Sequence, residues 1–199
     1  MSRLVLIRHA EPDESIRGRS YGRLDVPLSP AGRAQAAAIA EALCDTRLDA
    51  VFASPLRRAI ETAAPLAEAR GLAVVTHDGL RELQFGALEG LAFDEIARER
   101  PKLYESWMTD PTETRFPDGE SFADLRERAL AAAAEIRSEH ERAAVVAHGG
   151  VTRAILADAL EMPARAIFRL DQPYGAISVV EWMDGTALVR ALNLRAEPA

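Results

Sequence analysis

Short runs of consecutive apolar residues recur along the chain and stop abruptly at polar residues or glycine. Residues 4–7, 50–53, 72–75 and 143–147 form such runs. Continuous apolar runs of this length, without alternation, are typical of parallel strands that are covered on both faces. We therefore predict that these segments are strands of a buried, mostly parallel sheet.

Helical periodicity fills the stretches between these runs. A helix is predicted to begin at Ser29 and another at Ser54, because serine is a favourable N-cap and a proline follows each at the first helical position. The second helix should end by Gly71. A longer helix is predicted from Ser121, with Asp124 completing a variant of the capping box. A further helix is expected over residues 151–160.

Two segments differ from this alternation. Residues 91–120 are expected to form short helices followed by a loop, as in a lid over the edge of the sheet. Residues 176–182 and 187–192 are predicted strands, joined by a hairpin turn at Asp184-Gly185. Residues 197–199 are expected to be a frayed tail.

Strands that alternate with helices predict an α/β fold, a three-layer α/β/α sandwich with a mostly parallel central sheet. The C-terminal hairpin adds antiparallel pairing to that sheet. We expect residues 1–199 to form a single domain, with a lid or insertion at about residues 91–120.

Composition narrows the class of protein. The chain has 199 residues, 48% of them hydrophobic, and a formal net charge of -7, which argues against nucleic acid or an anionic membrane as a partner. Cys44 is the single cysteine, so no internal disulfide can form, as is typical of a reducing compartment. No apolar stretch suits a signal peptide or a membrane span. We expect a cytoplasmic protein.

The kinds of basic residue exclude several cofactor chemistries. Lys102 is the only lysine, in a polar stretch, so neither a P-loop nor a Schiff base is expected. No G-x-G-x-x-G follows a predicted strand, and no pair of histidines has the spacing of a metal site. We expect no cofactor and no metal. Arginine, which is abundant, is the better residue for bidentate phosphate contacts.

Two histidines follow predicted strands. His9 comes after residues 4–7 and Arg8, and His148 comes after residues 143–147 and before a pair of glycines. Ligands of open parallel sheets bind beyond the carboxyl ends of the strands. The two imidazoles therefore indicate an anion site at that edge, and we assign no role to the other two histidines.

Five segments, in order along the chain, resemble motifs of the histidine phosphatase superfamily, which includes the cofactor-dependent phosphoglycerate mutases. They are R-H-A-E at 8–11, L-D-V-P-L-S-P-A-G at 24–32, S-P-L-R-R-A at 54–59, L-R-E-L-Q-F-G-A-L-E-G at 80–90 and V-A-H-G-G at 146–150. One such motif is weak support, whereas the ordered set spans about three quarters of the chain. The resemblance implies a phosphoglycerate mutase-like fold.

The resemblance also implies roles for site residues. His9 is the expected nucleophile, because a neutral imidazole can attack phosphorus and leave as a phosphohistidine. Arg8 and Arg58 are expected to clamp the oxygens of the transferring phosphoryl group. The alternative for His9 is a histidine that only ends a strand, and for each arginine it is a solvent-exposed side chain, in both cases without a catalytic role. Arg57, beside Arg58, is expected in solvent.

His148 is expected to hydrogen-bond the phosphoryl group, helped by backbone N–H groups of the helix that follows Gly149. Glu82 is expected to protonate the leaving oxygen and then to take a proton from the attacking water. The alternatives are a core histidine and a solvated loop glutamate.

Contacts to the substrate are also implied by alignment with the family. Tyr21 and Gly22 align with a substrate-contacting pair, Gly149 follows His148, and Ser15 falls where many relatives have an asparagine that holds phosphate. Ala10 replaces the usual glycine of the first motif. Because serine has a shorter reach than asparagine, Ser15 is the weakest of these assignments.

The expected function is a phosphomonoester hydrolase that acts on a small phosphorylated metabolite through a phosphohistidine intermediate, without metal. F-P-D-G-E-S at residues 116–121 is similar to a segment of the alpha-ribazole phosphatase and fructose-bisphosphatase-like branches. Two alternatives remain: mutase-type phosphotransfer, which differs in what accepts the phosphoryl group, and a non-catalytic phospholigand-binding module. Monomer and homodimer both remain open.

Overall fold

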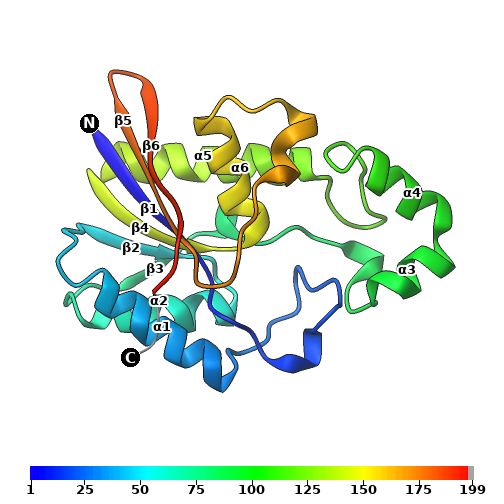
Figure 1. The fold of residues 1–199 in the computed structure, drawn as a ribbon, viewed down its shortest axis with the longest axis horizontal. Coiled ribbons are helices and arrows are strands. Elements are labelled where there is room, and N and C mark those ends of the chain that lie inside the picture. The colour runs from blue at the N-terminus through cyan, green and yellow to red at the C-terminus, as the bar shows by residue number, and fades with distance from the viewer. Residues whose placement is uncertain (197–199) are drawn as a thin grey trace.

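The computed structural model describes residues 1–196 and contains one six-stranded sheet (Figure 1). The strands are β1 (Ser2–Arg8), β2 (Ala50–Ala53), β3 (Val74–Thr76), β4 (Arg142–Ala147), β5 (Ile177–Met183) and β6 (Thr186–Leu194). Their order is β3-β2-β4-β1-β5-β6; the first four are parallel, and β5 and β6 are antiparallel to their neighbours. This is the predicted mostly parallel sheet with its antiparallel C-terminal hairpin.

Helices cover both faces of the sheet, which completes the predicted three layers. The helices are α1 (Pro30–Ala42), α2 (Arg57–Glu68), α3 (Phe93–Glu99), α4 (Pro101–Thr109), α5 (Phe122–Glu139) and α6 (Gly149–Ala159). Helices α5 and α6 lie on one face and α1 and α2 on the other (Figure 1). Within residues 1–196, no helix is both long and apolar enough to cross a membrane.

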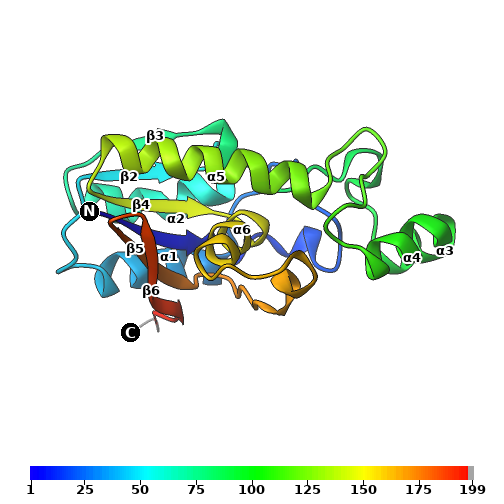
Figure 2. The same cartoon turned by 90° about the horizontal axis from the view of Figure 1, so that it is seen from above.

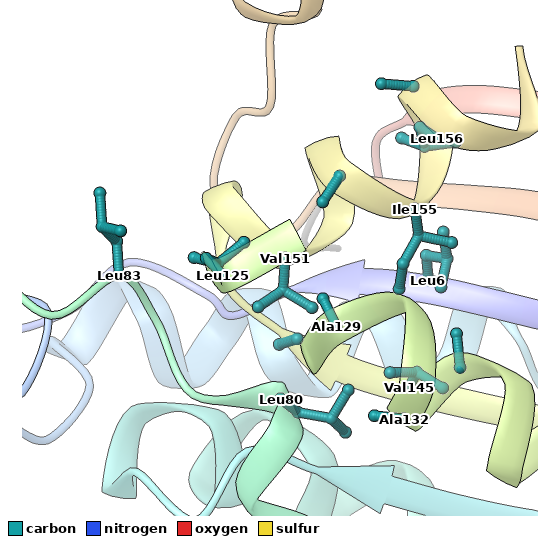
Figure 3. Packing of buried hydrophobic residues seen from close by; sticks show 14 of the residues in the cluster. Leu6, Leu80, Leu83, Leu125, Ala129, Ala132, Val145, Val151, Ile155 and Leu156 are labelled. Carbon is teal, nitrogen blue, oxygen red and sulfur yellow. The ribbon is translucent and has the colours of Figure 1, made fainter. Parts of the chain in front are cut away.

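The central strands are buried on both faces, as their unbroken apolar sequences require. Successive side chains of a strand point to opposite faces. Leu4 and Leu6 of β1 therefore join the core under α5 and α6, while Val5 and Ile7 join the core under α1 and α2. Figure 3 shows part of the first core, where α5 and α6 pack on the sheet through Leu125, Ala129, Ala132, Val151, Ile155 and Leu156.

Two of the predicted helix starts are confirmed and one is wrong. Ser29 caps α1 through Gly32 N, and Ser121 forms a capping box with Asp124 at the start of α5. Helix α2 begins at Arg57 rather than after Ser54, and its N-cap makes no side-chain hydrogen bond. The Ser54 hydroxyl instead contacts a side chain of another segment, described below.

Two further elements are longer or earlier than predicted: α6 begins at Gly149, two residues before the expected start, and β6 extends to Leu194. Strand β3 is shorter than predicted. Gly71, with φ of +62°, ends the turn after α2, and Leu72 N donates to Ala67 O, so Leu72 belongs to the helix cap rather than to the strand. Asp184 and Gly185 both have positive φ, as a tight hairpin requires. The predicted tail, residues 197–199, lies outside the described residues.

The parallel strands bring their carboxyl ends to one edge of the sheet. Arg8 pairs with Ala147, and Ala53 pairs with Val146, so the residues that follow these strands are neighbours in space. Helices α3 and α4 lie beyond this edge, at the end of the molecule opposite the β5–β6 hairpin (Figure 2). The short helices predicted within residues 91–120 are thus confirmed.

Candidate active site

The two strand-end histidines meet at the carboxyl edge of the sheet. Their ring centroids are 5.1 Å apart, and the residues are 1% and 0% exposed for His9 and His148. His9 N donates to Ala147 O, which continues the pairing of β1 with β4 by one residue. The sheet register therefore brings together two residues that are far apart in the sequence.

Hydrogen bonds orient both imidazoles. His9 Nδ1 is 2.7 Å from Ala10 O, which can only accept, so this nitrogen carries the proton and Nε2 keeps its lone pair. His148 Nε2 is 2.8 Å from Ser54 Oγ, and that hydroxyl also accepts a bond from Leu56 N. If Ser54 donates to Nε2, the proton of neutral His148 lies on Nδ1, which has no partner among the described atoms.

Burial keeps both histidines neutral. Desolvation, then the positive charges of Arg58 and Arg8, lower the pKa of His9 well below its usual value of 6.5. Desolvation and the same two guanidinium groups, together with His9, lower the pKa of His148 in the same direction. A neutral imidazole is the form that can act as a nucleophile.

These shifts predict that the free energy of unfolding falls as the pH is lowered below the ordinary histidine pKa of 6.5. The unfolded chain takes up protons on these histidines near pH 6.5, whereas the folded chain does not. Each such proton costs about 1.4 kcal/mol of stability per pH unit, until the pH reaches the lowered pKa of the folded state. Urea unfolding at several pH values measures this slope. His148→Gln should reduce it; a flat profile would contradict the prediction.

Two arginines flank the histidines. Arg58, 0% exposed, donates from Nη1 to Leu24 O and from Nη2 to Tyr21 O and Gly22 O, so its fork holds the loop before α1. Arg8 donates to Gln172 O. Arg57 is exposed and pairs with Glu61 of its own helix, as expected.

Three unsatisfied nitrogens are concentrated in this cluster. Arg8 Nε, Arg58 Nε and His148 Nδ1 are half of the six buried side-chain polar atoms that lack a hydrogen-bond partner among the described residues. An unsatisfied buried polar atom costs about 1–3 kcal/mol, so native folds contain few of them. Their concentration around His9 indicates a place built for an oxyanion.

Glu82 borders the cluster from the loop that precedes α3. Its Oε2 accepts from Gly150 N at 3.2 Å, and its Oε1 accepts from Leu83 N at 2.9 Å. A Cβ on Gly150 would lie 2.3 Å from Glu82 Oε1, so glycine at this position is what allows the carboxylate to approach the start of α6. The glycine pair after His148 thus has a steric role that the sequence did not reveal.

The rings of two tyrosines, Tyr21 and Tyr174, lie against His9, and sequence reasoning found only Tyr21. The hydroxyls of Tyr21 and Tyr174 are 2.7 Å apart. The Arg8 guanidinium lies 4.1 Å from the centre of the Tyr174 ring, and that of Arg58 lies 5.0 Å from the Tyr21 ring. Because β5 is antiparallel to β1, the residues before β5 arrive at the edge where β1 ends. Tyr174 precedes a strand that the sequence did predict, so an antiparallel pairing of that strand with β1 would have placed Tyr174 near His9.

Of the other residues expected to contact the substrate, Gly22 and Gly149 lie near the site and Ser15 does not. Gly22 packs so closely that a Cβ would lie 1.7 Å from Leu83 O, and a Cβ on Gly149 would lie 3.4 Å from the Arg8 guanidinium. Ser15 is not brought to the cluster: it is exposed, in a 3-10 turn over Glu14–Ile16, and its N donates to Asp13 Oδ1. Arg153, which the sequence analysis did not single out, lines the same cavity as Glu82 and Gly150.

Sequence comparison relates the chain to known proteins over nearly its whole length. The histidine phosphatase superfamily (branch 1) matches residues 4–195. Phosphoserine phosphatase 1 of Hydrogenobacter thermophilus is 30% identical over 196 residues, which cover 98% of this chain and 93% of the relative. Metal-independent phosphoserine phosphatase of Arabidopsis thaliana is 37% identical over 160 residues, covering 78% of this chain and 67% of the relative.

Structural comparison agrees. The crystal structure of a putative alpha-ribazole-5'-P phosphatase from Escherichia coli superposes with a TM-score of 0.90 at 30% sequence identity, covering 98% of this chain and 97% of that one. The predicted phosphoglycerate mutase-like fold is therefore confirmed.

Proposed function

Because the chain belongs to the histidine phosphatase superfamily, branch 1, we propose that it hydrolyses phosphate monoesters of small metabolites through a phosphohistidine on His9. The single observation that carries this proposal is the group of unsatisfied nitrogens on Arg8, Arg58 and His148 beside the unprotonated Nε2 of His9. A tetrahedral oxyanion offers acceptors to all three nitrogens while its phosphorus faces Nε2.

In the first step, His9 Nε2 attacks phosphorus, an N–P bond forms and the ester P–O bond breaks. Glu82 gives its proton to the departing oxygen, which leaves as an alcohol. Arg8 and Arg58 balance the charge that collects on the phosphoryl oxygens, and His148 donates from Nδ1.

In the second step, water attacks phosphorus while the Glu82 carboxylate accepts its proton. The N–P bond breaks, inorganic phosphate leaves, and His9 returns to the neutral state that its lowered pKa favours. The chemistry of both steps needs one acid–base group, which supports the assignment of this role to Glu82 at the edge of the cluster.

The names of the relatives indicate phosphate monoesters as substrates but no single leaving group. Relatives bear the names phosphoserine phosphatase and alpha-ribazole phosphatase, so their leaving groups differ widely. Residues 91–120 contribute Phe93 and Trp107 to the wall of the cavity that Arg8 and Glu82 also line. We therefore also propose that the chain is one domain in which this segment acts as a lid that selects the leaving group.

Release of inorganic phosphate tests the proposed function. The purified protein should release phosphate from 4-nitrophenyl phosphate, and from at least one of O-phosphoserine and alpha-ribazole 5'-phosphate, at the same rate with and without a metal chelator. Movement of the phosphoryl group to a second hydroxyl without phosphate release would instead indicate a mutase. No turnover of any ester would refute the proposal.

Glu82→Gln is expected to separate the two steps. The variant keeps an oxygen for Gly150 N but has no proton to transfer, so kcat for an alkyl ester should fall by roughly 10²–10⁴-fold. The nitrophenolate of 4-nitrophenyl phosphate leaves without a proton, so that ester should still phosphorylate His9, and the phosphoenzyme should then hydrolyse slowly.

Stopped-flow absorbance should therefore show a burst of about one nitrophenolate per enzyme before slow turnover, as expected for an accumulating covalent intermediate. Glu105→Gln changes an exposed glutamate of α4 and is the matched control. A Glu82→Gln variant that turns over alkyl esters at the wild-type rate would remove Glu82 from the mechanism.

A further inference from the structure

A cavity of ≈ 270 Å³ opens beside the histidine cluster, and its walls are unusually rich in aromatic side chains. We call it the aromatic cleft; its apolar walls are Leu83, Phe85, Phe93, Trp107, Phe122 and Phe168. The chain as a whole is only 6% aromatic. Five apolar rings around one small cavity, with Tyr21 as a sixth aromatic side chain, are therefore far more than composition alone would place there.

The rings form two groups. Trp107 contacts Phe85 and Phe93, with centroids 6.0 and 5.9 Å apart, while Phe122 contacts Phe168 at 4.9 Å. Across the two groups, no pair of the described rings is in aromatic contact, although all line one cavity. A cavity with this much aromatic surface in its walls favours a flat apolar guest.

Exposure supports a binding role for these rings. Phe93 and Phe168, which are 41% and 42% exposed, are the exposed aromatic side chains of the described part of the chain. Both line the aromatic cleft. Exposed apolar side chains that gather at one cavity are typical of a ligand site.

The aromatic cleft also lies where the leaving group must go. Glu82, Gly150 and Arg8 line it together with the rings. Under the proposed mechanism, Glu82 protonates the departing oxygen, so the remainder of the ester lies on the Glu82 side of the phosphoryl group. The first atoms beyond that oxygen therefore enter this cavity.

A second cavity is less suitable for the leaving group. It has a volume of ≈ 310 Å³ and shares Arg8, Arg19, Tyr21 and Phe93 with the aromatic cleft, but Glu82 does not line it. Three acidic residues do: Glu11, Asp13 and Glu14. Arg8, Arg17 and Arg19 line it as well, so its charges balance. What makes this cavity less suitable is that the proposed proton donor, Glu82, is not in its wall.

We propose that the preferred substrates are phosphate monoesters whose leaving group carries a flat apolar ring close to the ester oxygen, and that this ring binds in the aromatic cleft. The inference rests on the proposed function and adds to it the chemical class of the leaving group. Stacking on Trp107 and Phe93 supplies binding energy that a small aliphatic ester cannot gain.

The test compares benzyl, cyclohexylmethyl and propyl phosphate. All three release an ordinary alcohol, so differences in kcat/KM report the fit of the leaving group rather than its acidity. Benzyl phosphate should exceed propyl phosphate by about tenfold or more, because a filled apolar pocket discriminates by roughly that factor. It should also exceed cyclohexylmethyl phosphate, whose ring is apolar but not flat.

Single-residue variants test whether the preference for benzyl phosphate depends on the rings of the aromatic cleft. Phe93→Ala should remove most of the advantage of benzyl over propyl phosphate, and because Phe93 is exposed its loss should leave the fold intact. Trp107→Ala should do the same. Met108→Ala changes an exposed side chain of α4 that does not line the aromatic cleft, and should keep the full preference.

Equal kcat/KM for the three esters, or a preference that survives both Phe93→Ala and Trp107→Ala, would overturn this inference while leaving the proposed function standing. If no ester is hydrolysed, including 4-nitrophenyl phosphate, the proposed function itself fails. The two failures are therefore distinguishable.

Discussion

Replacement of His9 by alanine should lower kcat for phosphate monoester hydrolysis by roughly 10⁴-fold or more, the scale seen when an enzyme loses its nucleophile. The imidazole is held by its Nδ1 bond to Ala10 O, and its Nε2 lone pair is available at neutral pH because burial and two guanidinium groups lower its pKa. His148, 5.1 Å away, cannot replace it, because its Nε2 is hydrogen-bonded to Ser54. The N–P bond therefore has no second site at which to form.

The measurement has two parts: steady-state phosphate release, and acid-labile, base-stable label on the protein after brief exposure to labelled substrate. The wild-type protein should carry label and His9→Ala should not. His77→Ala and His140→Ala are matched controls, since both histidines lie outside the cluster, beside Glu135 and Phe52 respectively. Both should keep activity and label. Label that persists without His9 would place the covalent step elsewhere.

Much of the fold follows from sequence patterns that act over short distances. Unbroken apolar runs marked β1, β2 and β4, and Ser29 and Ser121 marked the starts of α1 and α5. Local patterns mislead where the residue that carries them instead contacts a residue far away in the sequence. Ser54 has the pattern of an N-cap, but its hydroxyl contacts His148, and α2 begins at Arg57, two residues later than that pattern predicts.

The site residues that follow parallel strands, such as His9 and His148, could be predicted from the sequence, because the carboxyl ends of these strands meet at one edge of the sheet. Tyr174 was missed because its position depends on the antiparallel register of β5 with β1, in which Ile177 pairs with Ile7. The aromatic cleft was missed because its rings come from five separate segments with no common spacing. Such convergence is set by packing, which leaves no periodic trace in the sequence.

The charge at the site is positive, whereas the net charge of the whole chain is negative. The protein carries a formal charge of -7, yet Arg8, Arg58 and Arg153 gather near the histidines with Glu82 as the acidic residue among them. An acidic surface with a positive pocket directs a phosphate dianion to the pocket and disfavours polyanions elsewhere. The two features act together in selecting small phosphorylated ligands.

Replacement of Arg58 by methionine should reduce both stability and activity. Its fork is the donor to the carbonyls of Tyr21, Gly22 and Leu24, so its loss releases the loop that carries Tyr21 and leaves polar atoms unsatisfied. We expect a loss of about 3 kcal/mol in the free energy of unfolding. We also expect kcat/KM to fall by roughly 10²-fold or more, because Arg58 Nε no longer stabilises the transferring phosphoryl group.

Arg57→Met is the matched control on the neighbouring residue. Arg57 is exposed and its pair with Glu61 is an i,i+4 surface ion pair, so its loss should cost no more than about 0.5 kcal/mol. Inorganic phosphate separates the two effects of Arg58. It should raise the melting temperature of the wild-type protein and of Arg57→Met, but much less that of Arg58→Met, because a ligand stabilises only a fold that binds it. An Arg58→Met variant that is destabilised yet responds fully to phosphate would show that Arg58 anchors the loop without contacting the anion.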